Sequence, residues 1–268
     1  MERIRFENLE RLSGFDVDLR PVYRKSSDIS MLSLKSGEEY SQKKCDFQIH
    51  VAFLSGEVEM SFENRVEKFK TGCLVSILPS REVKMRALED SRILIIRDDP
   101  LWVLRERRSV RKFSKIPVPK RSIEKIVEIS LLAPSAGNLQ PWKIYAIADQ
   151  RKKDDLARAS YDQEHVSQAP WVLVVTAVPS VSESEYGERG RKLYSIQDTA
   201  ALVTYITLAA KAYNLDTCWV GAFKDEEVWR IIGSPEGEVP VAIVPIGYGE
   251  ESPEIPDRKP LKEVLEFI

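Results

Sequence analysis

The stretch APSAGNLQPW, residues 133–142, is the most informative part of the chain. Two prolines and a glycine end a helical pattern here and fix a loop. Within that loop, Ser135, Asn138 and Gln140 carry short polar side chains that both donate and accept hydrogen bonds. Such a set suits a planar heterocycle with several carbonyl and ring-nitrogen atoms, although serine and asparagine are also common in loops that bind nothing.

Helices and strands alternate on both sides of this loop. The apolar residues of 119–133 recur at helical spacing and predict an amphipathic helix. Residues 143–149, 170–178 and 239–249 predict buried strands, and residues 197–215 predict a long buried helix. This alternation is typical of an α/β or α+β layered domain.

The remaining segments of this half are shorter. Residues 217–223 predict a strand that runs into a turn, and residues 224–233 predict a helix that ends at Gly233. The polar segment Ser180–Lys192 predicts a mobile loop, and it is the one candidate for a lid or a dimer arm.

The first hundred residues have a different pattern. From Ile29 to Arg97, apolar and polar residues alternate in short runs separated by turn residues, which predicts a sandwich or barrel of antiparallel strands. Turns are expected at residues 35–37 and 55–56, and a hairpin tip at residues 63–64. Asp98-Asp99-Pro100 then predicts a helix start and a boundary, which divides the chain into domains 1–98 and 99–268.

Composition narrows the possible function classes. The 268 residues are enough for two domains, and a hydrophobic content of 43% allows each a core. No apolar run reaches the roughly 18 residues of a membrane span, and the N-terminus lacks the apolar core of a signal peptide, so a soluble cytoplasmic protein is expected. A net charge of −2 argues against nucleic-acid binding, and three cysteines without CxxC spacing argue against a thiolate metal site.

Two further clusters could bind an anion. Residues 105–113, RERRSVRKF, offer forked guanidinium donors and a hydroxyl that suit a phosphate, although such charge runs are usually a solvated helix face. Gly247-Tyr248-Gly249 follows a buried strand, where glycines permit close backbone approach, and Arg258 and Lys259 come shortly after. Neither GxGxxG nor GxxxxGK[ST] occurs, so the common nucleotide-binding motifs are not supported.

Together the three clusters are more specific than any one of them. RRSVRKF, APSAGNLQPW and PIGYG…DRKPL, in that order, resemble the nitroreductase family of flavoproteins, and WVGAF at residues 219–223 falls where that family has its loop beside the isoalloxazine. The resemblance covers about residues 100–268. It implies a three-layer α+β fold and a homodimer with two FMN molecules at the subunit interface.

The resemblance also implies which residues hold the cofactor. Arg107, Arg108, Ser109 and Arg111 would bind the FMN phosphate, ribityl chain and pyrimidine edge, and Gly221 and Ala222 would present N–H groups to the flavin N5 and O4 region. Gly247 and Arg258 would close over the phosphate, with Lys259 as the alternative to Arg258. The partner chain would contribute the remaining loop residues: Pro134, Ser135, Ala136, Asn138 and Gln140.

The chemistry implied by the family is that of the cofactor. A nicotinamide, from NADH or NADPH, would pass hydride to the flavin N5, and a nitro, quinone or similar small acceptor would then replace it in a ping-pong cycle. No side-chain acid or base is required, so His165 is expected to be structural.

Residues 36–88 resemble a small cupin barrel, on the signals VAFLSGEVEMSF and TGCLVSILPS. At the places where cupins carry metal ligands, this chain has Lys43, Cys45, Gln48 or Ile49, and Lys84. A protonated lysine cannot ligate, and His50 has no partner histidine, so no metal is expected. The barrel would bind a ligand, dimerise or serve as a structural module.

Three alternatives stay open. Some members of the same superfamily dehalogenate substrates or fragment flavin. A redox or ligand sensor would bind an effector in the barrel and turn over little, and a dimeric scaffold would have a degenerate flavin site.

Overall fold

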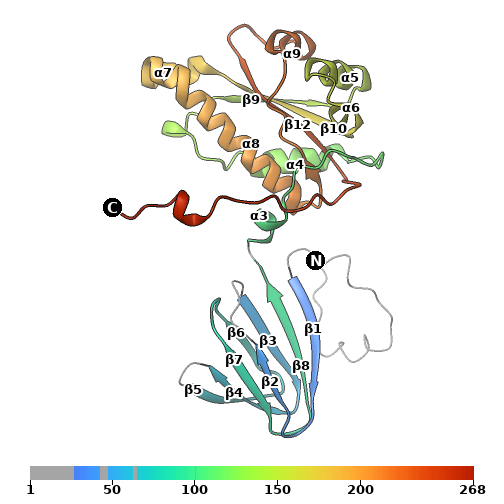
Figure 1. Ribbon diagram of the computed structural model, residues 1–268, viewed down its shortest axis with the longest axis vertical. Helices are drawn as coiled ribbons and strands as arrows, with labels where there is room; N and C mark the ends of the chain where they lie inside the picture. The colour runs from blue at the N-terminus through green and yellow to red at the C-terminus, as the bar shows by residue number, and fades with distance from the viewer. Residues whose placement is uncertain (1–26, 43–47, 63–64, 100) are drawn as a thin grey trace. The chain divides into compact units, whose positions relative to one another are not determined.

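The computed structural model describes residues 27–42, 48–62, 65–99 and 101–268 (Figure 1). The chain divides into two compact units, Met1–Glu106 and Arg107–Ile268. The strand β8 (Ser91–Asp98) ends at the predicted domain boundary, and the short helix α3 (Trp102–Glu106) follows before the second unit begins. The backbone N–H of Leu101 donates to the Asp99 carboxylate (2.9 Å), so one of the two predicted acids does bind the helix start. The division after residue 98 stays a prediction.

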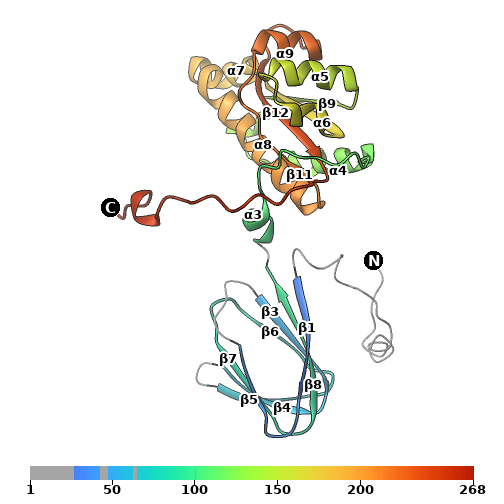
Figure 2. The same ribbon diagram turned by 45° about the vertical axis from the view of Figure 1, so that its right-hand side comes forward.

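Strands make up the described part of the first unit (Figure 2). One four-stranded sheet has the order β1-β8-β3-β6, the other has the order β2-β7-β4-β5, and all neighbouring strands are antiparallel. The strands besides β8 are β1 (Ser27–Leu34), β2 (Glu39–Gln42), β3 (Gln48–Ser55), β4 (Glu57–Phe62), β5 (Arg65–Lys70), β6 (Leu74–Ile77) and β7 (Val83–Ala87). The antiparallel arrangement agrees with the alternating sequence pattern, and the likeness to cupins stays a prediction.

The core of this unit lies between its two sheets. Strand β7 shows the reason, because Val83, Met85 and Ala87 are buried while the intervening Lys84 and Arg86 are exposed. The buried residues of both sheets form one cluster, which includes Val51, Phe53, Val58, Met60, Ile93 and Ile95.

The predicted turns at Gly37 and Gly56 are present, with φ values of 87° and 82° that favour glycine. The predicted hairpin tip at residues 63–64 lies outside the described residues, as do Lys43 and Cys45. Among the residues that are described, no group of three or more His, Cys, Asp or Glu side chains is placed to hold a metal ion.

The second unit has a four-stranded antiparallel sheet with the order β11-β12-β10-β9. Its strands are β9 (Trp142–Ile147), β10 (Trp171–Ala177), β11 (Asp216–Thr217) and β12 (Val239–Gly247). The strand predicted over residues 217–223 is wrong beyond Thr217. After β11 the chain pairs with β12 only through a bridge between Val220 and Ile243.

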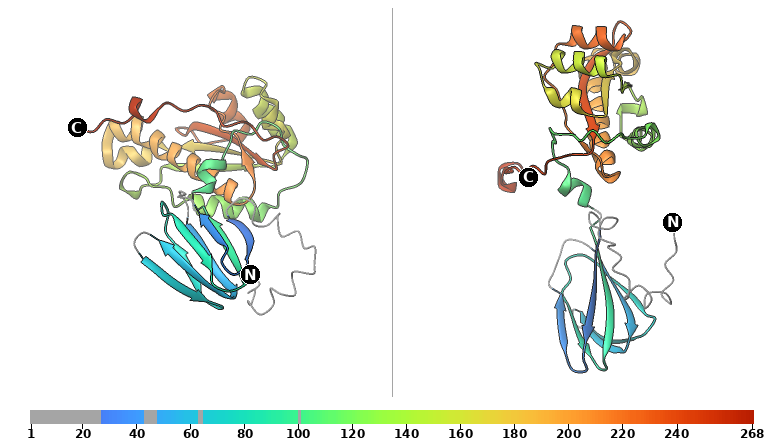
Figure 3. Two further views of the ribbon diagram at one scale, coloured as in Figure 1. Left: turned by 60° about the horizontal axis from the view of Figure 1, so that its bottom comes forward. Right: turned by 90° about the vertical axis from the view of Figure 1, so that its right-hand side faces the viewer.

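Helices cover both faces of this sheet and make the three layers (Figure 3, right). They are α4 (Lys120–Ser130) and α8 (Ser195–Ala212) on one face, and α5 (Gln150–Ala159), α6 (Glu164–Gln168) and α9 (Asp225–Ile232) on the other. Strand β10 shows how both cores form. Leu173 and Val175 pack in the α4–α8 cluster, and Val172 and Val174 pack in the α5–α9 cluster. The predicted α+β three-layer fold is confirmed.

The mobile loop predicted over residues 180–192 is wrong, because this segment is helical. It forms α7 (Pro179–Arg189) and the π-helical turn η3 (Gly190–Tyr194). Tyr186 and Tyr194 pack edge to face with ring centroids 5.3 Å apart, and the Arg189 guanidinium donates to the Tyr194 hydroxyl (2.9 Å). The sequence looks like a loop because most of its residues are charged or polar, yet aromatic contacts and helical ion pairs hold it together.

Of the helices that the structure describes, none is long and apolar enough to cross a bilayer.

Candidate functional site

The arginine-rich cluster RRSVRKF and the glycine cluster at residues 247–249 meet at one end of the sheet of the second unit. The backbone N–H of Val110 donates to the carbonyl of Thr217 (3.0 Å), so residues 107–111 run beside β11. Farther along, the N–H of Ser114 donates to the carbonyl of Tyr248 (2.8 Å). The segment RRSVRKF is therefore held by backbone hydrogen bonds between residues more than one hundred positions apart, rather than forming a solvated helix face.

Two carboxylates fix this junction, and neither was among the predicted site residues. Asp216 accepts from the Lys211 ammonium (2.8 Å) and from the backbone N–H of Gly249 (3.2 Å). Glu251 accepts from the backbone N–H of Arg111 (2.6 Å). Acidic residues beside a glycine-rich turn were the only signal in the sequence, and it was too weak to find them.

Gly247, the last residue of β12, and Gly249, just after the strand, are both required by protein packing. A Cβ atom on Gly247 would lie 2.5 Å from Cδ of Pro170, and one on Gly249 would lie 2.8 Å from a carboxylate oxygen of Asp216. Close approach to a ligand was the expected reason for these glycines. The structure gives a different one, since the glycines allow the 107–114 segment and the β10 entrance to pack closely.

Three guanidiniums gather at the start of the segment. Burial lowers the pKa of half-buried Arg107, and the charges of Arg108 and Arg258 lower it further. Like charges this close disfavour one another, so a bound anion would stabilise all three. Arg258 and Lys259 are both exposed, but only the charge of Arg258 contributes to lowering the pKa of Arg107, which favours Arg258 as the third cation.

Cys218 lies next to this group and was not predicted. Burial raises the pKa of its thiol, while Arg111, Ser109 and Arg107 act in the opposite direction. The bridge between Ser109 and Thr217 brings the segment that carries Arg107, Ser109 and Arg111 next to this buried thiol. One hydroxyl and two guanidiniums therefore belong to the same short stretch of backbone beside Cys218.

His165 is also a neighbour of this group. It is buried, at 7% exposure, and its Nε2 atom has no hydrogen-bond partner among the described residues. Burial lowers the pKa of its imidazole, the positive charge of Arg111 lowers it further, and Glu251 raises it. A lone histidine carried no sequence signal for this position, and the expectation that it is structural stays a prediction.

Gly221 and Ala222 follow the bridge between Val220 and β12. Both residues are exposed, and among the described residues their backbone N–H groups donate to no acceptor. A Cβ atom on Gly221 would have only Trp219 within 4 Å, at 3.8 Å. The backbone here is open, and its donors are available to a ligand.

The loop 133–142 is held in an unusual conformation. A 3-10 turn, η2 (Ala136–Asn138), lies within it, and Gly137, Asn138 and Gln140 all have φ values between 51° and 57°. The backbone N–H of Gln140 donates to the Ser135 hydroxyl (3.0 Å), and the Gln140 amide donates to the Asn138 carbonyl (3.1 Å). Two non-glycine residues in the left-handed region indicate that local bonds, not propensity, set this loop.

Asp198 of α8 binds the backbone of this loop. Its carboxylate accepts from the backbone N–H of Ala136 (3.1 Å), and it is 9% exposed. Burial raises the pKa of Asp198, and the Ala136 hydrogen bond only partly opposes this effect. Burial of this carboxylate has an energetic cost, and its hydrogen bond to Ala136 stabilises the loop in return.

The structure thus brings together two of the three predicted clusters. Within the described chain, no hydrogen bond or ion pair links loop 134–140 to residues 107–111 or 247–251. The loop lies instead beside α7, where Tyr186 faces Gly137. One chain therefore holds an anion-binding half and a separate polar loop.

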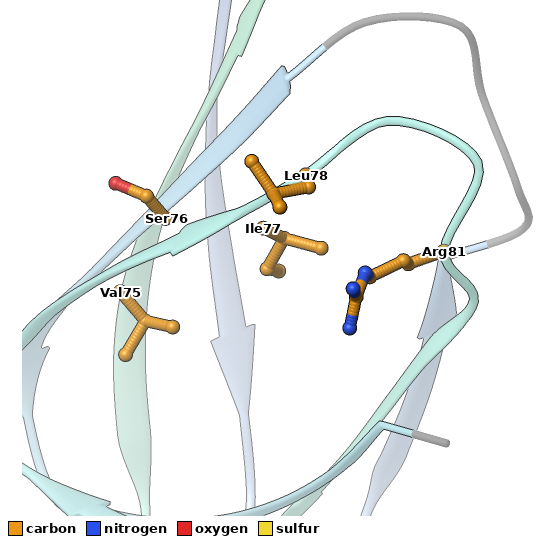
Figure 4. Close-up of a pocket in the computed structure, with 5 residues that line it drawn as sticks. All are labelled: Val75, Ser76, Ile77, Leu78 and Arg81. Atoms are coloured by element: carbon orange, nitrogen blue, oxygen red, sulfur yellow. The ribbon is translucent and has the colours of Figure 1, made fainter.

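The first unit has a small cavity of its own, of about 150 Å³ (Figure 4). Val75, Ser76 and Ile77 of β6 line it with Leu78, and the Arg81 side chain extends towards Ile77. On the same strand, the Ser76 hydroxyl is hydrogen-bonded to His50 Nδ1 (2.8 Å). The cavity is large enough for only a very small ligand.

Comparisons with known proteins agree with this geometry. The Nitroreductase family model matches residues 104–167 and 158–248. A protein named NADH dehydrogenase from Thermus thermophilus is 32% identical over 187 residues, which cover 60% of this chain and 91% of that protein.

Solved structures show the same fold. A nitroreductase family protein from Streptococcus pneumoniae has a TM-score of 0.60 at 20% identity, over 63% of this chain and 100% of the other. The NADPH:FMN oxidoreductase from Vibrio harveyi, complexed with NAD+, has a TM-score of 0.57 at 23% identity, over 62% of this chain and 75% of the other. With a family model that spans more than half of the sequence, these matches show that the chain belongs to the nitroreductase family.

Proposed function

We propose that the chain is a homodimeric oxidoreductase that binds FMN at the Arg107–Arg258 cluster and transfers electrons from NAD(P)H to a small acceptor in a ping-pong cycle. The predicted enzyme class and cofactor pair are confirmed at the level of the family. A relative from Vibrio harveyi is named NADPH-flavin oxidoreductase and is 26% identical over 168 residues. The residue roles, the dimer and the acceptor are the proposal.

The cationic cluster is the observation that carries this proposal. Arg107 is half-buried beside Arg108 and Arg258, and the pKa of Arg107 is lowered by burial and by both neighbours. A phosphate monoester would add negative charge beside these cations and matches the forked donors of arginine. The residues present therefore fit the phosphate end of FMN.

The rest of the half-site fits the remainder of the cofactor. Ser109, which lies between Arg107 and Arg111 in the segment beside β11, would bind the ribityl chain. Arg111 would face the pyrimidine edge, where its charge stabilises negative charge on the reduced ring in a partly dry site. Gly221 and Ala222 offer unused backbone N–H groups to the opposite edge.

FMN, when bound, supplies the two-electron redox chemistry, and the protein supplies orientation and charge. The pKa of Cys218 is raised by burial, which keeps the thiol protonated, and the pKa of His165 is lowered by burial, which keeps the imidazole neutral. Both groups are therefore uncharged near neutral pH.

The second half of the site would come from a second copy of the chain. Ser135, Ala136 and Asn138 form a self-contained loop, and none of them is hydrogen-bonded to the cationic cluster within the described chain. Pro134 is exposed at the start of the same loop. In a dimer, the loop of each chain would complete the half-site of its partner.

A sensor is the second candidate function, and the cavity at β6 of the first unit favours it. In that case the protein would hold FMN but turn over slowly, with an effector bound in the first unit.

One experiment separates these functions. The full-length protein should purify yellow, release FMN on denaturation at one molecule per chain, and bleach under anaerobic conditions with NADH or NADPH. Reoxidation by a nitroaromatic or a quinone should complete the cycle. A yellow protein that bleaches with neither nicotinamide would favour the sensor, and a protein that cannot be loaded with FMN would contradict the site.

A further inference from the structure

The second unit contains a cavity of about 640 Å³ that includes none of the predicted flavin-binding residues. It lies between the segment that leads into α4 and the helices α5 and α6. Its lining combines basic, amide and apolar residues: Lys115, Pro117, Val118, Ala148, Gln150, Lys153, Ser167, Gln168, Pro170 and Trp171. The volume is in the range of sites for small organic molecules.

Lys153 is the unusual residue of this cavity. Its side chain belongs to α5 and is 5% exposed, yet its ammonium makes one hydrogen bond, to the carbonyl of Ala169 (2.7 Å). Among the described residues, no carboxylate lies within ion-pair distance of Lys153. A buried ammonium that is bound to one neutral carbonyl, with no anionic partner among the described residues, is unfavourable.

The nearest acidic side chains are engaged elsewhere. Asp149 accepts from the backbone N–H of Lys152 (2.9 Å), and Asp154 accepts from the Gln150 amide (2.8 Å). Burial lowers the pKa of Lys153, and the charges of Asp154 and Asp149 partly oppose that effect. Among the described residues neither carboxylate forms an ion pair with Lys153, so an anion in the cavity would be the first direct ionic partner of its ammonium.

The other walls suit an apolar body. The Trp171 ring nitrogen already donates to the carbonyl of Val118 (2.8 Å), so the ring offers apolar surface rather than a donor. Pro117 and Pro170 add apolar area, and exposed Lys115 adds a second positive charge at the rim.

We propose that this cavity binds a small organic anion with an apolar body, such as an aromatic carboxylate, with its carboxylate on the Lys153 ammonium and its ring against Trp171. The site is separate from the cationic cluster. It adjoins that cluster through Pro170, which packs against Gly247.

The test uses full-length, FMN-loaded protein titrated by calorimetry with benzoate and with benzamide, its uncharged counterpart. Benzoate should bind at one site per chain, and benzamide should bind at least about tenfold more weakly, because it lacks the charge-assisted bond. Lys153→Gln keeps a donor for Ala169 and loses the charge, so it should weaken benzoate binding by a similar factor. Lys152→Gln, an exposed neighbour on the same helix, should bind benzoate as the wild type does.

Two results would overturn the proposal. One is equal affinity for benzoate and benzamide in the wild type, or no binding of either; this comparison remains informative even if Lys153→Gln fails to fold. The other is benzoate binding that persists in Lys153→Gln and perturbs the visible flavin spectrum, which would place the anion over the flavin instead.

Discussion

Residues 107–114 and residues 134–140 are the two halves of the candidate site, and they are built in opposite ways. The first half is pinned by backbone bonds to β11 and to the turn after β12, and its charged side chains gather around Cys218. The second half is a loop whose bonds stay within itself and to Asp198 of α8. Under the proposed function, a second copy of the chain would bring the two halves together.

The largest effect is expected where the first half is broken. Arg107→Ala combined with Ser109→Ala should weaken FMN binding by about 100-fold or more, since each charge-assisted bond contributes about 1.5–3 kcal/mol. FMN released per chain, measured by absorbance after denaturation, checks this. Arg151→Ala is the control, because Arg151 is exposed on α5 and should leave the flavin content unchanged. Full flavin retention by the double variant would show that the phosphate lies elsewhere.

Breaking the anchor of the second half should have a smaller effect. Asp198→Leu removes the acceptor for the Ala136 N–H and should weaken FMN binding by about tenfold, in line with the loss of a hydrogen bond to a charged group. Asp198→Asn keeps an acceptor and should stay within about threefold of the wild type. Fluorescence titration of FMN measures both affinities, and equal losses in the two variants would exclude a role for this hydrogen bond.

The same residue gives a stability prediction. Because burial raises the pKa of Asp198, the folded state disfavours its charge. The free energy of unfolding should therefore fall as pH rises from the ordinary value of about 3.9 through the raised folded value. Asp198→Asn should lack this fall, as measured by urea unfolding across that range. A pH dependence identical to that of the wild type would contradict the assignment.

A single added methyl group at Gly247, beneath residues 107–114, should lower the stability of the second unit. Gly247→Ala places a Cβ atom 2.5 Å from Pro170 and should destabilise the second unit by about 1–3 kcal/mol. Gly221→Ala has open space around its new methyl and should leave the stability unchanged. Urea unfolding followed by tryptophan fluorescence compares the two variants. Equal stability would mean that the Gly247 contact relaxes without effect.

The smallest effect concerns His165, beside Arg111. Its pKa is lowered from 6.5 by burial, so the unfolded chain takes up a proton first as pH falls. The free energy of unfolding should decrease as pH falls below about 6.5, and His165→Gln should remove much of that decrease. His50→Gln, which removes the histidine of the first unit, is the matched control. An unchanged acid response in His165→Gln would show that its burial has no energetic consequence.

The sequence predicted the layers of the second unit because its strands and helices have strong and different periods. The segment 170–178 is a continuous apolar run and forms the central strand β10, buried on both faces. The loop predicted over residues 180–192 was wrong because this helical segment depends on tyrosine packing and ion pairs rather than on an apolar stripe. The strand predicted over residues 217–223 was wrong because only two of its residues pair with the sheet. Thr217 belongs to β11, and Val220 forms an isolated bridge to β12.

The site was only partly predictable for a related reason. Arginine and glycine clusters are visible in a sequence, and residues 107–111 and 247–249 do meet. Asp198, Asp216 and Glu251 each accept a hydrogen bond from a backbone N–H that is distant in sequence, and no local pattern marks such a bond. The packing role of Gly247 was also not predictable, because only the fold shows that Pro170 occupies the space a side chain would need.

Mixing two damaged chains tests the shared site most directly. The variant Arg107→Ala/Ser109→Ala lacks one half, and a Ser135→Ala/Asn138→Ala variant lacks the other. Differently tagged copies, produced together and purified through both tags, form a heterodimer with one intact site and one doubly damaged site. If the halves come from different chains, this heterodimer should hold one FMN, well above either parent variant. Flavin content no higher than in the parents would show that both halves act within a single chain.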